Sequence, residues 1–167
     1  MHLRFLALAF ACAAGAASAQ ALNPSDPDWK EAEAPRPPAV RTTGLIPLEV
    51  PGSLLRFGVE PSSVSLGPDG VVRYVVVASS SAGAVNAMYE GVRCSSGQVR
   101  LFARHNPDSG WVQTPASEWR SVHEDSNFRY SLQVARNGAC IGQAPSHSVA
   151  QILRDLRGSA DRRFEKY

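Results

Sequence analysis

Gly67-Pro68-Asp69-Gly70-Val71-Val72-Arg73-Tyr74-Val75-Val76-Val77-Ala78 predicts a tight turn that leads into a central β-strand. Proline between glycines is typical of turns. Successive side chains of a strand point to opposite faces, so residues 72, 74, 76 and 78 share one face and residues 71, 73, 75 and 77 share the other. Both sets are mostly apolar, which indicates a strand in the middle of a sheet whose two faces are covered.

The segments on either side of this strand also alternate with a period of two. Apolar residues alternate with polar or small ones around Leu55-Arg56-Phe57, in residues 85–90 and in residues 98–104. Four strands joined by short turns predict an antiparallel meander. Trp111-Val112 and residues 119–122 are expected to add short edge strands, so the sheet should contain four to six strands.

The last regular element is expected to be an amphipathic helix. Ser148 and Gln151 form a capping box, and four apolar residues follow at helical spacing up to Leu156. Gly158 stands at the C-terminal cap position. Residues 127–135 fit either a strand or a helix, and we favour a helix. The predicted fold is therefore α+β: a single antiparallel sheet of four to six strands with the C-terminal helix packed on one face.

The globular domain is expected to span residues 54–157, with different segments before and after it. Residues 20–53 are rich in proline, which removes backbone donors and disfavours both helices and central strands. We expect an extended arm laid over the domain and anchored by Trp29, since tryptophan is usually buried. Residues 158–167 are expected to form a polar C-terminal tail.

Residues 1–19 have the three parts of a secretory signal peptide. Arg4 provides the positive start, an apolar run follows, and Ala17-Ser18-Ala19 is a small-residue cleavage site. The run is shorter than the roughly 20 apolar residues that a membrane span needs. Lipid attachment at Cys12 is the alternative, but Ala9-Phe10-Ala11 fits it poorly. The mature chain is therefore expected in an oxidising compartment, by default the periplasm.

Cleavage changes the number of cysteines from three to two, because Cys12 lies in the leader. The remaining pair, Cys94 and Cys140, is expected to form a disulfide in an exported protein. The two cysteines are not arranged as Cys-x-x-Cys, which disfavours a thioredoxin-type redox centre.

The overall charge argues against nucleic-acid binding. The chain contains 17 basic and 15 acidic residues, and the leader removes Arg4, which leaves a formal charge of +1. Nucleic-acid binders usually have a strongly basic face. Alternation predicts that Arg100 and Arg104 share one face of the sheet, which is compatible with an anionic partner. Glu90 and the near-zero net charge argue against one.

Three blocks of sequence resemble a known family. They are Asp69-Gly70-Val71-Val72-Arg73-Tyr74, Gly83-Ala84-Val85-Asn86 and Tyr89-Glu90-Gly91-Val92-Arg93-Cys94. With Asp28-Trp29-Lys30-Glu31 in the arm, they resemble the cryptic-neisserial-protein-like exported proteins of bacteria over about residues 26–156. The resemblance implies an exported single domain. It implies no activity and no catalytic residue.

Asn86, Glu90 and Arg93 form the candidate polar cluster. Asn86 and Glu90 share a strand face because they are four residues apart. Arg93 has the opposite parity unless Gly91 introduces a bulge, as glycine in a strand often does. With a bulge, the amide, carboxylate and guanidinium would form one cluster that resembles a binding site. We favour the alternative, in which these side chains form an ion pair that orders the sheet or are independently solvated.

No catalytic, cofactor-binding or metal-binding residue can be assigned. The chain contains no Gly-x-Ser-x-Gly elbow, and no two mature histidines stand at metal-ligand spacing. The sequence therefore favours a non-enzymatic periplasmic binding or accessory module, whose partner is another envelope protein or an anionic envelope component. The alternatives are a small periplasmic hydrolase that uses Glu90 and His123, and a purely structural envelope protein.

Overall fold

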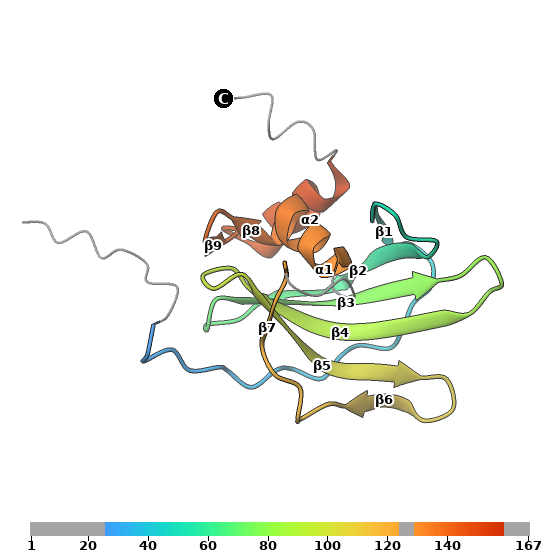
Figure 1. The fold of residues 1–167 in the computed structure, drawn as a ribbon, viewed down its shortest axis with the longest axis horizontal. Helices are drawn as coiled ribbons and strands as arrows, with labels where there is room; N and C mark the ends of the chain where they lie inside the picture. Colours follow the sequence, from blue (N-terminus) through green and yellow to red (C-terminus); the bar gives the residue numbers. More distant parts are fainter. Residues whose placement is uncertain (1–25, 124–128, 159–167) are drawn as a thin grey trace, which may run out of the picture.

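The computed structural model describes residues 26–123 and 129–158. The expected signal peptide and nearly all of the C-terminal tail lie outside these residues. The described part is an α+β fold with one large antiparallel sheet and a C-terminal helix (Figure 1).

The large sheet contains seven strands, more than the four to six expected. Six of them follow the chain in the order β1-β2-β3-β4-β5-β6, and β7 pairs with the other end of β5. The strands are β1 (Ile46–Leu48), β2 (Arg56–Leu66), β3 (Val71–Ser79), β4 (Val85–Arg93), β5 (Gln98–Asn106), β6 (Gly110–Gln113) and β7 (Arg120–Ser121). A separate two-stranded sheet, β8 (Cys140–Ile141) and β9 (Ala144–Pro145), corrects the expectation of a single sheet.

The additional strand β1 lies inside the proline-rich segment that was expected to be an extended arm. It pairs only with β2, and Pro47 stands opposite Gly58. An edge strand tolerates proline because one of its sides has no ladder bond to lose. The arm therefore ends in a strand of the sheet, and only its earlier part lies across the domain without regular structure.

Strand β3 lies at the centre of the sheet, as its sequence predicts. Its first eight residues, Val71 to Ala78, are all buried. The turn before it has the expected geometry, since the amide of Gly70 donates to the carbonyl of Gly67 at 3.0 Å and Gly70 has a φ of 75°. Glycine adopts this left-handed conformation without a steric cost.

The two faces of β3 contact different layers. Val72, Tyr74 and Val76 belong to one buried cluster with the helical segments, whereas Val75 and Val77 belong to another with residues of the arm. The helical layer contains α1 (Arg129–Val134), the π-helix η2 (Ala135–Ala139) and α2 (Val149–Arg157). Helix α2 contacts β1, β2 and η2.

The expected helix ends are present. The Ser148 side chain accepts a hydrogen bond from the amide of Gln151 at 3.2 Å, and the amide of Gly158 donates to the carbonyls of Arg154 and Asp155. The ambiguous segment is helical from Arg129, while Asn127 and Phe128 lie outside the described residues.

Candidate functional site

Glu90 is fully buried beneath α1, and three hydroxyl groups donate hydrogen bonds to its carboxylate. The Tyr130 hydroxyl lies 2.5 Å from Oε1, while the Ser131 and Tyr74 hydroxyls lie 2.8 and 3.2 Å from Oε2. Tyr130 and Ser131 belong to α1, whereas Tyr74 belongs to β3. The carboxylate therefore joins the helical layer to the centre of the sheet.

The electrostatics of this group match a structural acceptor. Burial raises the pKa of Glu90, although the three hydroxyl donors and the charge of Arg104 oppose the shift. Burial, and then the negative charge of Glu90, raise the pKa of both Tyr74 and Tyr130. The tyrosines thus stay protonated, and their hydroxyl groups donate hydrogen bonds to the carboxylate.

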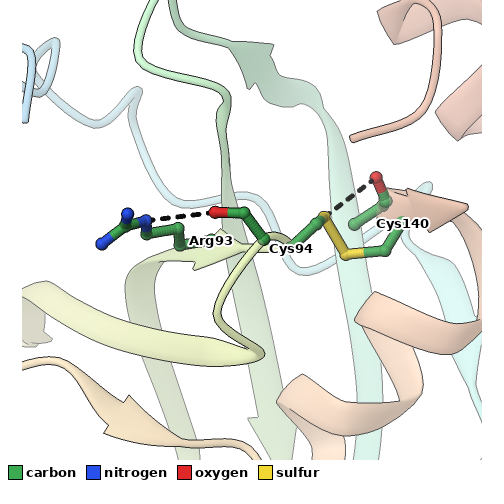
Figure 2. The surroundings of a disulfide bond; sticks show 5 residues. Arg93, Cys94 and Cys140 are labelled. Carbon is green, nitrogen blue, oxygen red and sulfur yellow. Dashed lines mark hydrogen bonds between the residues drawn. A yellow bond between two sulfur atoms is a disulfide. The ribbon is translucent and has the colours of Figure 1, made fainter. Parts of the chain in front are cut away.

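Arg93 lies on the opposite face of β4 from Glu90. Its guanidinium carbon is 3.8 Å from the centre of the Trp29 ring in the arm, and its Nε donates to the Ser95 hydroxyl at 3.2 Å. Figure 2 shows the side chains of Arg93, the last residue of β4, and of Cys94, which follows it, pointing to opposite sides. The pairing of β3 with β4 continues through Gly91 without a shift, so β4 has no bulge there.

The candidate polar cluster is therefore divided. Asn86 and Glu90 share the helical face, but Glu90 is enclosed while Asn86 is exposed and lines a cleft. Arg93 instead holds the arm. No single site contains all three side chains.

A register shift in β5 separates the two arginines that were expected to share a face. Tyr89 pairs with Ala103 while Glu90 pairs with Leu101, so Phe102 is an extra residue on β5. Arg100 consequently faces the arm, where its Nη1 contacts the Glu31 carboxylate at 2.5 Å. Arg104 faces the helical side.

The cleft that Arg104 and Asn86 line is the candidate site. It has a volume of about 530 Å³ and lies between the β1–β2 connection, the sheet and α1. Its floor includes Phe57, Ala78 and Asn86, which stand side by side on β2, β3 and β4. The Tyr130 ring stacks on Phe57 with 5.0 Å between ring centres, which closes the inner end against Glu90.

The polar groups around this cleft are basic or neutral. Arg104 and Arg129 are exposed at its rim, and His105 and Asn86 also line it. Among the described residues no carboxylate lines the cleft. Its remaining lining is largely apolar or small, so the cleft combines an apolar floor with a positive rim.

The disulfide lies away from this cleft. Cys94 and Cys140 are bonded with 5.6 Å between their Cα atoms, within the usual range for disulfides (Figure 2). The Cys94 sulfur lies 3.6 Å from the carbonyl oxygen of Ala139. Because a disulfide sulfur carries no proton, this is a packing contact. The bond ties the end of β4 to β8.

A second hollow, of about 660 Å³, lies beside the disulfide and contains His123 in its lining. Glu90 lines neither hollow. The structure therefore does not present the carboxylate and this imidazole together to a common cavity among the described residues.

Residues 24–157 match the sequence model of the CNP1-like family. The chain belongs to the CNP1-like family. This confirms the resemblance carried by the sequence blocks around β3 and β4. The CNP1-like region includes the arm, the sheet and α2, but the family has no assigned activity. No curated protein and no solved structure matches the chain.

The described part of this CNP1-like chain contains no helix long and apolar enough to cross a membrane. It also contains no group of three or more metal-binding side chains.

Arg129 and Tyr130 are the site residues that the sequence does not identify. Both lie in the segment with ambiguous periodicity, and they reach the cleft because α1 crosses β4 there. A firm helix assignment for residues 127–135 would not have identified the strands beneath, on which the positions of both side chains depend.

Proposed function

We propose that this protein is an exported, non-enzymatic binding module that holds an anionic component of the bacterial envelope in the cleft between β4, β5 and α1. The observation that supports this most directly is the combination of a large cleft, two exposed arginines at its rim and no described carboxylate in its lining. Guanidinium groups are well suited to carboxylate and phosphate partners. The cleft volume is in the range of small-molecule sites.

The environment of Glu90 disfavours the hydrolase alternative. A general base must reach the proton that it removes. Glu90 has no exposed surface, and its carboxylate already accepts three hydrogen bonds. His123 lines a different hollow. Binding therefore explains the cleft without a catalytic role for either residue.

The remaining layers fit a rigid support for this cleft. Ile152 and Leu156 of α2 are buried in the same cluster as Val59 and Val76 of the sheet, which supports a C-terminal helix packed on one sheet face. Export to the periplasm is part of the proposal and rests on the leader in residues 1–19 and on the pairing of the two mature cysteines.

Export has a direct chemical test. The protein recovered from the producing cells should begin at Gln20, as measured by intact mass and N-terminal sequencing. Thiol titration of the unfolded mature chain without reductant should find no free thiol. A full-length chain, or two free thiols, would contradict the proposed export.

Binding can be tested by recovering the ligand itself. Mature protein is incubated with envelope extract and reisolated, and the released small molecules are identified by mass spectrometry. We expect an anionic species that wild type enriches and that the double variant Arg104→Gln/Arg129→Gln does not. Arg154→Gln/Arg157→Gln is the matched control, because it also removes two positive charges, at exposed positions on α2 outside the cleft.

Unchanged circular dichroism would show that the double variant still folds. Equal enrichment by the folded double variant and by wild type would overturn the assignment of the cleft. Failure of wild type to enrich any species would overturn the binding function.

A further inference from the structure

We infer that the ligand of this cleft is an anionic amphiphile, with a carboxylate or phosphate head group held by Arg104 and Arg129 and one aliphatic chain laid along the apolar floor. This inference rests on the proposed binding function and specifies its ligand class. Four observations carry it: the composition of the floor, the separation of the charged groups from it, the exposed apolar residues at the same end of the sheet, and the volume.

The floor and one wall of the cleft suit an aliphatic chain. Phe57 and Met88 provide apolar surface on β2 and β4, and Ala78 between them leaves space because its side chain is small. Val50 and Leu55 line the wall formed by the β1–β2 connection. Burial of an aliphatic chain here stabilises a complex because it removes apolar surface from water.

The positive groups stand at the rim of this apolar surface. Arg104 pairs with Met88 across the β4–β5 ladder and faces the helical side, while Arg129 begins α1 and its Nη1 lies near Gly52 on the opposite wall. Neither arginine forms an ion pair with another described residue. Each guanidinium is suited to a carboxylate or phosphate head group, to which it can donate two parallel hydrogen bonds.

The large apolar side chains that are exposed on the described surface gather at the same end of the sheet. Leu54 is 98% exposed, Leu55 41%, Val85 38% and Val112 48%. They lie on or beside the β1–β2, β3–β4 and β5–β6 connections, which Figure 1 shows at one end of the strands. Leu55 lines the cleft itself, while the other three lie outside its lining. Ile141, on β8, is the remaining described member of this class.

Val112 also lines a neighbouring hollow of about 420 Å³ that shares Asn86, Arg104 and His105 with the cleft. The cleft is therefore flanked at Arg104 by a second hollow whose lining is mainly polar, with Val112 and Pro107 as its apolar residues.

The volume fits a chain of moderate length. At about 30 Å³ per heavy atom, the share of a water molecule in the liquid, a cleft of about 530 Å³ holds on the order of 15 heavy atoms. A ten-carbon carboxylate is below this size. The amphiphile can reach the cleft as a free monomer or from an anionic bilayer, and both sources present the same chemistry.

The test measures calorimetric binding of the mature, disulfide-bonded protein to decanoate, decyl phosphate, decanol and inorganic phosphate, all below the concentrations at which they aggregate. We expect decanoate and decyl phosphate to bind at least about tenfold more tightly than decanol, since a charged hydrogen bond contributes enough for one factor of ten. Arg104→Gln and Arg129→Gln should each weaken decanoate binding by about tenfold. Arg157→Gln should not change it.

A second pair of variants tests whether the apolar wall of the cleft binds the aliphatic chain of the ligand. Leu55→Ser should weaken decanoate binding severalfold, because it removes apolar surface from the wall of the cleft. Ile141→Ser changes an equally exposed residue on β8 and should have no effect. Both positions are at least 41% exposed, so neither substitution opens a cavity in the core.

Vesicles distinguish the source of the amphiphile. If the protein binds phosphatidylglycerol vesicles but not phosphatidylcholine vesicles, and Arg104→Gln abolishes this binding, the amphiphile is taken from a bilayer. If decanoate binds but neither vesicle does, the ligand is a free monomer. Either result supports the inference.

Three outcomes would overturn it. Equal affinity for decanoate and decanol would show that the protein does not recognise the charged head group. Equal affinity for decyl phosphate and inorganic phosphate would show that it does not recognise the aliphatic chain. Absence of binding to all amphiphiles and vesicles, while the arginine-dependent species is still captured from envelope extract, would reject this ligand class and leave the proposed binding function intact. If wild type also captures no species from envelope extract, both the ligand class and the proposed binding function are rejected.

Discussion

Asp69 links the turn, the central strand and the arm through one buried carboxylate. It accepts hydrogen bonds from the amides of Ala32 and Val71 and forms an ion pair with Arg73, and both charged side chains are 1% exposed. Its backbone carbonyl also accepts from the indole nitrogen of Trp29. Burial alone would raise the pKa of Asp69, but the hydrogen bonds from Arg73, Ala32 and Val71 lower it below 3.8.

Replacing this carboxylate should therefore give a pH-dependent loss of stability. Because the folded-state pKa is lowered, ionised Asp69 stabilises the fold above pH 3.8, and this contribution is lost as the pH falls through the folded value. At pH 7, Asp69→Asn should lower the free energy of unfolding by about 3 kcal/mol, since it leaves the buried charge of Arg73 without its partner. Asp108→Asn, at an exposed turn, is the control. In urea unfolding, an equal loss for Asp69→Asn at pH 7 and at pH 3 would contradict this assignment.

Glu90 should show the opposite dependence on pH. Burial raises its pKa above 4.5, so the folded state binds the proton more tightly than the unfolded chain does. Its stability contribution is complete below pH 4.5 and is lost as the pH rises through the folded value. Wild type should thus lose stability relative to Glu90→Gln as the pH increases, whereas its difference from the exposed control Glu49→Gln should not show that trend. A constant difference between wild type and Glu90→Gln in urea unfolding would refute the shifted pKa.

At the scale of elements, the arm is a structural part of the sheet's second face. Trp29 packs edge-on against Trp119 with 5.8 Å between ring centres, and the Glu31 carboxylate contacts both Arg100 and the Trp119 indole nitrogen. The indole nitrogen of Trp111 donates a hydrogen bond to the backbone carbonyl of Pro38 in the arm. These contacts hold a proline-rich segment in place without regular secondary structure.

Removing the anchor should release part of this segment. Trp29→Ala should lower the free energy of unfolding by about 2 kcal/mol, below the range for fully buried aromatic residues because Trp29 is half-buried. It should also speed thermolysin cleavage within residues 29–40. Lys30→Ala, at the exposed neighbouring position, should change neither measurement. If Trp29→Ala changes neither the free energy of unfolding nor the rate of thermolysin cleavage, the arm does not depend on this residue.

The elements that were predicted from the sequence are those whose pattern is local. Strands β2 to β5 alternate clearly, and α2 has both a cap and an apolar stripe. Strand β1 was missed because Pro47 argues against a strand until an edge partner is known. The shift at Phe102 was missed for a similar reason, since a bulge leaves no mark in the alternation of Arg100 and Arg104.

The candidate site was predictable only in part. Asn86 and Glu90 were identified because polar side chains interrupt an apolar strand, but their separate environments depend on where α1 lies. Arg129 reaches the rim through a contact between segments far apart in the sequence. Such a contact is set by tertiary packing, which a single sequence does not encode in any local pattern.

At the scale of the whole molecule, one sheet separates two buried clusters that are held by different means. The arm covers one face through tryptophans and ion pairs. The helical layer covers the other, and two links join it to the sheet: the hydroxyl groups of α1 on Glu90, and the Cys94–Cys140 disulfide. Both layers pack against β3. The contacts that hold the arm are different from the hydrogen bonds and the disulfide that hold the helical layer.

This arrangement predicts that loss of the disulfide loosens one layer more than the other. A bond that closes a span of 46 residues stabilises a fold by about 4 kcal/mol in loop-entropy terms. In the double variant Cys94→Ala/Cys140→Ala, amide hydrogen exchange should accelerate most in residues 129–157, where the helical layer keeps only its packing and the Glu90 bonds. Exchange in β3 and in the arm should accelerate less.

Trp29→Ala should give the complementary pattern, with faster exchange in the arm and little change in α2. Equal acceleration throughout the chain in both variants would show that the two layers open as one cooperative unit, and that the disulfide stabilises the whole fold rather than its helical side.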